Sequence, residues 1–241
     1  SSDLETDPIG QMMTSRFDCR LPLQRVGHAD LFDNGLGEWF IVHLCGRPLP
    51  SKGRSPMGRE TAIQQVYWTE DGWLRLTNNS ITPELTVQTR LKERPWPTPP
   101  ARDEFDTPEL PLHYQSLRIP LSEEMCTLTE RRGWLRLRGY ESLSSQHYQS
   151  LLARRQTDFI YTAQTCVDFK PHSFQQMAGL VCFYDTTNYV YLNISCNDAG
   201  ERTVNLMVND LNRFSLPTGE GVKIAAEGLV YLRVCVKDDG A

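Results

Sequence analysis

The chain has 241 residues, of which 39% are hydrophobic and 23% are charged, as in an ordinary globular protein. A net charge of −5 without a polybasic segment argues against nucleic acid and against an anionic membrane surface as partners. The apolar runs are shorter than the ~20 residues of a membrane span, and the acidic stretch SSDLETDPIG lacks the pattern of a signal peptide.

The first half of the chain is predicted to form β-strands. A strand is expected at residues 39–44, after an Asn34-Gly35 turn. Residues 65–69 and 73–76 flank Asp71-Gly72, and this dipeptide between apolar runs is one of the strongest short signals of a β-hairpin.

A change of composition follows in KERPWPTPPARD, residues 92–103, which carry four prolines. Proline has no backbone donor, so this stretch is excluded from a central strand and is expected to be an extended linker. The sequence therefore predicts a first domain at residues 1–94, a linker at 95–103 and a second domain at 104–241.

The second half also reads as strands, and Ser145 to Arg155 is a weak helix-like candidate. In residues 189–196 the alternation puts apolar side chains on one face and Tyr189 and Tyr191 on an outer face, which we expect another sheet or loop to cover. Period-two runs with frequent turns predict an antiparallel β-sandwich. The further expected strands are 134–138, 165–169, 178–184 and 229–236.

The cysteines are widely spaced and form no CxxC motif, so neither a zinc ribbon nor a thioredoxin-like site is expected. An odd number of cysteines scattered among strand-like segments predicts buried, reduced thiols and a cytoplasmic protein. The seven are Cys19, Cys45, Cys126, Cys166, Cys182, Cys196 and Cys235.

The sequence contains no Walker loop, GxSxG, HExxH or dinucleotide-binding fingerprint. The acidic residues near glycines and turns are interpreted as turn or surface groups, because loops favour Asp for local hydrogen bonds. We therefore assign no catalytic residue within this chain. The acidic residues in question are Asp30, Asp33, Glu38, Glu60 and Asp71.

Two side chains beside glycines have both a structural and a functional interpretation. His28 follows Gly27 and is either a structural histidine at a strand start or a site residue. Arg59 follows Gly58 and either forms an exposed ion pair with Glu60 or directs its guanidinium at a carboxylate or at substrate hydroxyls.

Taken together, the segments PLQRVGHADLFDNGLGEWFIVHLCGRPLP and PMGRETAIQQVYWTEDGWLRL resemble the last part of the catalytic propeller of glycoside hydrolase family 43, in its β-xylosidase branch. FDTPELPLHYQSLRIPLSEEMCTLTERRGWLRLRGYESL and ARRQTDFIYTAQTCVDFKPHSFQQMAGLVCFYDTTNYVYL resemble the C-terminal sandwich of that branch. The resemblance implies an all-β fold, with the last blade or blades of a five-bladed β-propeller followed by a concanavalin-like antiparallel β-sandwich.

The resemblance also implies an inverting glycosidase that releases xylose, with arabinofuranosidase side activity, from the non-reducing ends of xylo-oligosaccharides. Such an enzyme needs a carboxylic acid and a carboxylate base about 6.5–9.5 Å apart. The family places these groups and a third carboxylate in earlier blades, outside this sequence. Because the turn Asp238-Asp239-Gly240 has no return strand, the chain is expected to be part of a longer enzyme, with a sandwich truncated at its C-terminal end. Because the three carboxylates lie outside it, the chain is expected to be inactive alone.

By resemblance, Arg59 points into the substrate pocket, where it pairs with catalytic carboxylates and contacts the sugar hydroxyls. His28 lies at the floor of the −1 subsite, where it supports the carboxylates or binds a divalent cation such as calcium near the propeller axis. No cofactor is required. The partners implied are a xylo-oligosaccharide or arabinosyl substrate and further copies of the same chain in a homo-oligomer. The alternative is a non-catalytic carbohydrate-binding or scaffold β-sandwich module.

Overall fold

The computed structural model describes residues 6–49 and 52–237, and in these residues it contains strands, turns and loops but no α-helix. The described residues form two compact units. The first unit consists of residues 6–97 and Thr157–Phe159, and the second of residues 98–156 and 160–237. No described helix is long and apolar enough to span a membrane. The all-β prediction is therefore confirmed.

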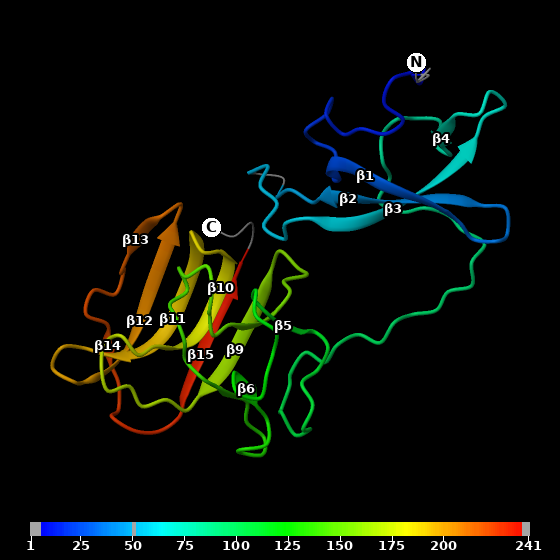
Figure 1. Cartoon of the computed structure of the whole chain (residues 1–241). Coiled ribbons are helices and arrows are strands. Elements are labelled where there is room, and N and C mark those ends of the chain that lie inside the picture. The colour runs from blue at the N-terminus through cyan, green and yellow to red at the C-terminus, as the bar shows by residue number, and fades with distance from the viewer. Residues whose placement is uncertain (1–5, 50–51, 238–241) are drawn as a thin grey trace. The chain divides into compact units, whose positions relative to one another are not determined.

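The first unit is built on one antiparallel sheet whose strands lie in chain order (Figure 1). These strands are β1 (Gln24–Asp33), β2 (Trp39–Gly46), β3 (Glu60–Trp68) and β4 (Leu74–Leu76). Four consecutive antiparallel strands are the architecture of a single propeller blade. The hairpin predicted around Asp71-Gly72 is confirmed as the connection between β3 and β4.

One face of this sheet carries the apolar core of the first unit. Ile41, Val66 and Leu76 come from three neighbouring strands and are each only 2% exposed. Trp39 packs against them and meets Trp68 edge-on, with the ring centroids 6.0 Å apart. The core therefore lies where β2, β3 and β4 pair, toward the β1–β2 hairpin end of the sheet.

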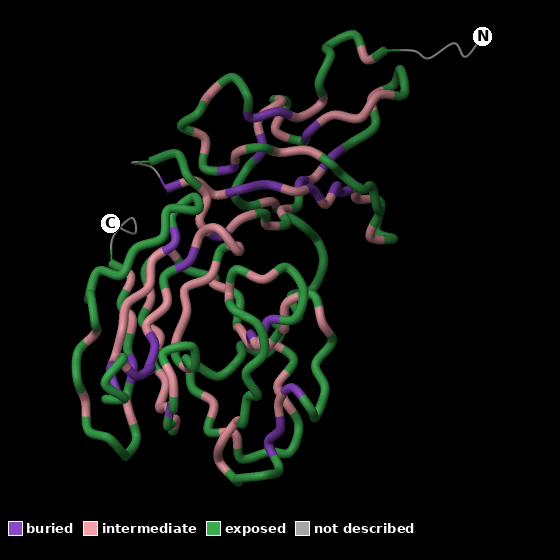
Figure 2. Tube along the Cα trace, turned by 60° about the vertical axis from the view of Figure 1, so that its left-hand side comes forward, coloured by how far each residue is buried: buried purple, intermediate pink, exposed green. Residues whose placement is uncertain are grey.

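The second unit is built from several antiparallel sheets. Its largest sheet has the order β10-β11-β12-β13, with β14 also paired to β12, and the β15–β9 pair runs beside β10 (Figure 1). Residues 98–156 contribute loops and the short pairs β5–β8 and β6–β7. Exposed residues dominate the connecting loops (Figure 2). The strands are β5 (Tyr114–Ser116), β6 (Cys126–Thr127), β7 (Arg136–Leu137), β8 (Leu152–Arg154), β9 (Tyr161–Val167), β10 (Ala178–Asp185), β11 (Asn188–Cys196), β12 (Arg202–Asp210), β13 (Arg213–Ser215), β14 (Val222–Lys223) and β15 (Val230–Val236).

The face assignment of β11 holds for Ile194 and Cys196, which are 0% and 5% exposed, but not for the start of the strand. Tyr189 on the expected outer face is 6% exposed, whereas Val190 on the expected inner face is 38% exposed. The Ser144 hydroxyl lies 3.2 Å from the Tyr189 hydroxyl, so a loop of residues 98–156 covers this side of the strand, and the expected covering is confirmed. Burial also raises the pKa of Tyr191.

Three further expectations differ from the structure or fall outside it. Residues 145–155 form turns, loops and β8 instead of a helix. All seven cysteines lie among the described residues and are free thiols, but Cys19 and Cys235 are exposed, so the prediction of uniform burial is wrong. The turn predicted at Asp238-Asp239-Gly240 lies outside the described residues.

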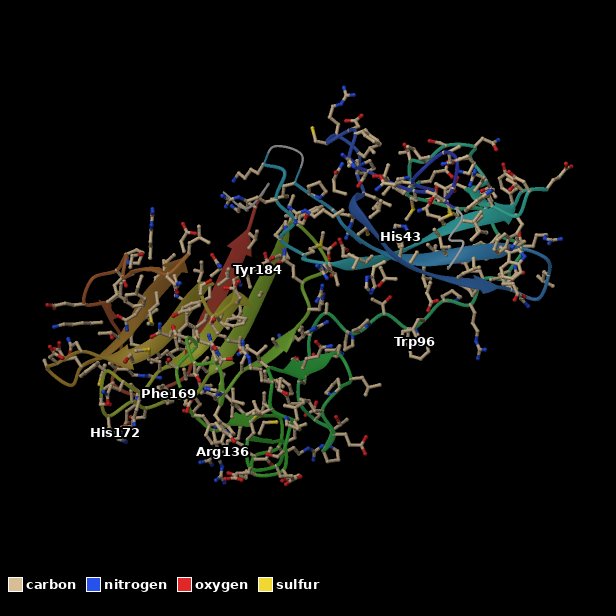
Figure 3. All side chains as sticks on the ribbon, turned by 45° about the horizontal axis from the view of Figure 1, so that its top comes forward. His43, Trp96, Arg136, Phe169, His172 and Tyr184 are labelled. Carbon is tan, nitrogen blue, oxygen red and sulfur yellow. The ribbon has the colours of Figure 1, made fainter. Side chains whose placement is uncertain are left out.

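The proline-rich residues 92–103 contain no strand and are mostly exposed, as the missing backbone donors of proline require. Trp96 lies within this extended stretch and is 88% exposed (Figure 3). The domain limits at residues 94, 95–103 and 104 stay predictions.

Candidate substrate-binding site

Strand β1 contains two β-bulges, and both lie in the half that carries His28. The register runs from the pair Gln24–Gly46 to Gly27–Leu44 and then to Asp30–Val42. Each step covers three residues of β1 and two residues of β2, so each inserts one extra residue into β1. Gln24, Gly27 and Asp30 therefore share one face of the sheet at a spacing of three.

The backbone is strained at each bulge. Arg25 has a φ of 55° and His28 a φ of 54°, and both values lie in the left-handed region that residues with a Cβ avoid at a cost of about 1–2 kcal/mol. Bulges and such conformations concentrate next to active sites, where they redirect a side chain. His28 is exposed and does not behave as a buried structural histidine.

A tight turn places Arg59 directly before β3. The backbone N–H of Gly58 donates to the carbonyl of Ser55 at 2.9 Å, and Gly58 has a φ of 70°. Glycine reaches this conformation without the steric penalty of a Cβ, which explains the Gly-Arg sequence. Arg59 follows the turn with an exposed side chain.

The neighbouring Glu60 forms an ion pair with Arg47. Arg47 Nη2 and Nε donate to the Glu60 carboxylate at 2.8 and 3.0 Å, and the two side chains are 40% and 24% exposed. This bidentate pair joins the end of β2 to the start of β3 and raises the pKa of Arg47. The Glu60 charge is thereby compensated by Arg47.

The register brings His28 and Arg59 to the same end of the sheet. His28 lies on β1 opposite residues 42–44 of β2, and Arg59 precedes Glu60, the residue of β3 that pairs with Cys45. Because neighbouring strands are about 4.8 Å apart, the backbones of β1 and β3 lie roughly 10 Å apart across β2.

His43 is a third candidate, which sequence reasoning missed. It lies on β2 opposite the His28 bulge and is 2% exposed (Figure 3). Its Nδ1 is 3.1 Å from the carbonyl of Leu44, so Nδ1 carries the proton and Nε2 is an acceptor. Within the described residues Nε2 is buried without a partner. Only the three-dimensional register could have identified this residue.

The described acidic residues of this sheet have structural roles. Asp33 Oδ1 accepts from the Gly35 N–H at 2.8 Å, and Asp30 Oδ1 accepts from the Leu31 N–H at 3.2 Å. Glu38 accepts from the backbone N–H of Arg90 at 3.1 Å and from the amide of Asn34. These bonds hold turns and chain segments in place.

The pKa of Glu38 reflects opposing influences. Desolvation acts to raise it, but the hydrogen bonds from the Arg90 backbone and from Asn34, together with the Arg90 charge, bring the pKa below its usual value. The carboxylate is therefore held ionised as a structural anchor, which does not suit a proton-donating role.

The described residues do not themselves supply a calcium site. Among residues 6–49 and 52–237 no three His, Cys, Asp or Glu side chains are grouped to hold a metal ion. Calcium also prefers oxygen ligands, and His28 offers only nitrogen. A metal role for His28 stays a prediction, and no chemical step is assigned to a metal here.

Comparison with known proteins gives two matches to family profiles. Residues 2–74 match the profile "Glycosyl hydrolases family 43", and residues 102–241 match "Beta xylosidase C-terminal Concanavalin A-like domain". The second match covers more than half of the chain. The two matches fall on the two kinds of structure described above, the propeller-type sheet and the sandwich.

Among similar proteins, "Xylan 1,3-beta-xylosidase" of Vibrio sp is 37% identical over 245 residues, covering 97% of this chain and 45% of that protein. "Xylosidase/arabinosidase 43B" of Humicola insolens is 37% identical, covering 97% and 44%. The crystal structure of xylan beta-1,4-xylosidase from Bacillus halodurans C-125 is 43% identical with a TM-score of 0.91, covering 97% and 45%. The chain thus spans less than half the length of these relatives. With both profiles and the fold in agreement, the chain belongs to glycoside hydrolase family 43, in the group that carries the concanavalin-like domain of β-xylosidases.

Proposed function

We propose that this chain provides the C-terminal part of an inverting glycoside hydrolase that releases xylose, with arabinose as a second product, from the non-reducing ends of xylo-oligosaccharides. The observation that carries the proposal is the strained, exposed His28 at the same sheet end as the Gly58-Arg59 turn in a family 43 chain. The similar proteins named as xylosidases and arabinosidases support the substrate class.

In this proposal the reaction uses carboxyl groups contributed from outside the present sequence. One carboxylic acid gives its proton to the glycosidic oxygen as the bond from the anomeric carbon breaks. A carboxylate takes a proton from the water that attacks that carbon from the opposite face. The structural roles of Asp30, Asp33, Glu38 and Glu60 support placing these groups elsewhere.

Arg59 supplies a fixed positive charge to this pocket. Its guanidinium would lower the pKa of the carboxylate base and hold the sugar hydroxyls through a planar set of donors. His28 orients the same groups from the opposite side of β2.

The test uses p-nitrophenyl β-xyloside and p-nitrophenyl α-arabinofuranoside. The 241-residue chain alone should hydrolyse neither substrate. A hybrid that joins the N-terminal part of the Bacillus halodurans xylosidase to this chain should hydrolyse the xyloside, since the two folds superpose with a TM-score of 0.91. Hydrolysis by the chain alone would place the carboxylates within it, and a folded, inactive hybrid would contradict a catalytic role for this sheet.

A further inference from the structure

A buried arginine without a carboxylate partner lies in the second unit. Arg202, the first residue of β12, is 6% exposed. Its Nη1 donates to the carbonyls of Ala225 and Gly228 at 3.3 and 3.0 Å. Its Nε is buried and has no hydrogen-bond partner among the described residues. Buried cations in proteins are normally paired with an anion, so this guanidinium lacks the partner that its burial calls for.

The acidic side chains nearest along the chain are already paired with lysines. Glu201, which precedes Arg202, lies 2.8 Å from Lys223 Nζ. Glu227, in the loop that Arg202 holds, lies 2.8 Å from Lys170 Nζ. Within the described residues no carboxylate is in ion-pair contact with Arg202. Among the described residues, the positive charge of Arg202 therefore has no anionic partner.

Arg202 also lines a cavity, so such a partner has a route to it. The cavity has a volume of about 250 Å³, and it lies between the start of β12 and the segment leading into β15. Its walls combine apolar and aromatic side chains with two charged ones. The lining residues are Arg202, Ile224, Ala225, Glu227, Leu229, Val230 and Tyr231.

The lining indicates the chemical class of the ligand. Nη1 already donates to two carbonyls and Nε is buried, so Nη2 is the donor that a carboxylate oxygen can reach, in a charge-assisted hydrogen bond. The Glu227 charge is balanced by Lys170 and does not exclude a singly charged ligand. Leu229 and Val230 offer apolar surface, and the Tyr231 ring, 69% exposed, can stack on the C–H face of a sugar. We propose that Arg202 and residues 224–231 bind the carboxylate of a sugar acid, a hexuronate.

None of the residues of this site belongs to the β1–β4 sheet, so its binding can be tested apart from the proposed hydrolysis. The proposal concerns binding by the sandwich, so an inactive hybrid enzyme would not contradict it. Equally, a failure to bind hexuronate would not contradict the proposed hydrolysis.

The test measures binding of glucuronate, xylose and acetate to the 241-residue chain by isothermal titration calorimetry. Xylose lacks the carboxylate and acetate lacks the ring. We expect glucuronate to bind at least about tenfold more tightly than either, with an affinity that weakens as salt is added. No glucuronate binding, or equal binding of acetate, would overturn the proposal.

Variants then locate the site. Arg202→Met should weaken glucuronate binding at least about tenfold, while Arg213→Met, which removes an exposed arginine of the same sheet, should leave it unchanged. Tyr231→Ser changes an exposed ring and keeps the guanidinium, so it also tests the site if Arg202→Met fails to fold. It should weaken binding several-fold. Unchanged binding in Tyr231→Ser, or in a folded Arg202→Met, would overturn the assignment.

Discussion

The two ends of the β1–β4 sheet differ in how regular they are. At the hairpin end, Leu31 to Asp33 pair without interruption with Ile41 to Trp39, and Glu38 ties the hairpin to Arg90. At the other end, two bulges break the ladder and His28 takes a left-handed conformation. The apolar core lies toward the regular end, whereas the exposed candidate site residues lie at the strained end. Within one sheet, the apolar core and the candidate site are therefore separated along the strands. Substitutions at the two ends of the sheet can test this division.

The largest effect is expected from Arg59→Ala at the strained end. In the active hybrid this substitution should reduce kcat/KM by about 10²–10³, because it removes a preorganised positive group from the pocket. Steady-state kinetics with p-nitrophenyl β-xyloside measure this. Arg54→Ala, an exposed arginine a few residues earlier, serves as the control and should stay near the parent rate. Parent-like kinetics for Arg59→Ala would remove Arg59 from the site.

The next effect concerns stability within the core face. The Gln64 side chain is 1% exposed, donates to the Glu84 carbonyl at 2.8 Å and accepts from the Glu84 N–H at 2.9 Å. Gln64→Leu leaves both backbone groups without these partners and should lower the free energy of unfolding by about 2 kcal/mol. Urea unfolding followed by tryptophan fluorescence measures it.

The neighbouring Gln65 offers a matched control for that experiment. Its amide makes one long hydrogen bond of 3.4 Å to Glu38. Gln65→Leu should cost less than about 1 kcal/mol. If the two substitutions destabilise equally, the paired bonds between Gln64 and Glu84 are not what fixes residue 84 against β3.

The third prediction compares the two bulges. Replacing His28 or Arg25 with glycine relieves left-handed strain, so each variant should gain up to about 1 kcal/mol of stability. Only His28→Gly should lower kcat/KM of the hybrid, by about tenfold, because only His28 is assigned to the site. Thermal unfolding and kinetics together decide this. A loss of activity in Arg25→Gly of the same size would show that bulge geometry matters and that the imidazole does not.

The smallest effect is a pH dependence at the regular end. Because folding lowers the pKa of Glu38 from a usual value of 4.5, its stabilising contribution is present above that value and is lost as the pH falls through the folded pKa. The difference in Tm between the parent chain and Glu38→Gln should therefore shrink between about pH 6 and about pH 3. A difference that stays constant over this range would mean that the bonds to Arg90 and Asn34 do not favour the ionised form.

The sequence predicted the regular parts of this fold well, for identifiable reasons. Asp71-Gly72 specifies a hairpin locally, and in β15 alternation correctly places Leu232 on the buried side at 3% exposure and Tyr231 on the exposed side. Strand β1 was not recognised, because its two bulges replace a spacing of two by a spacing of three. In β11 a loop distant in sequence buries Tyr189, which alternation alone does not show.

The candidate site was predictable only in part. Glycines beside His28 and Arg59 marked unusual backbone, and resemblance to a family supplied their expected roles. The Arg47–Glu60 pair and the buried Nε2 of His43 depend on which residues face each other across strands. Register is a property of the folded sheet, so these two features had no signal in the chain itself.

The double bulge of β1 has a consequence for how this strand tolerates changes in length. Each bulge absorbs its own extra residue, so Gln24, Gly27 and Asp30 keep the same face although they are three residues apart. Deleting Arg25 alone, or His28 alone, would therefore restore a plain spacing of two at one bulge and leave the rest of β1 facing as before. The two bulges can thus be lost one at a time during evolution. Only the loss of the second bulge would remove His28, and the apolar core would stay in register.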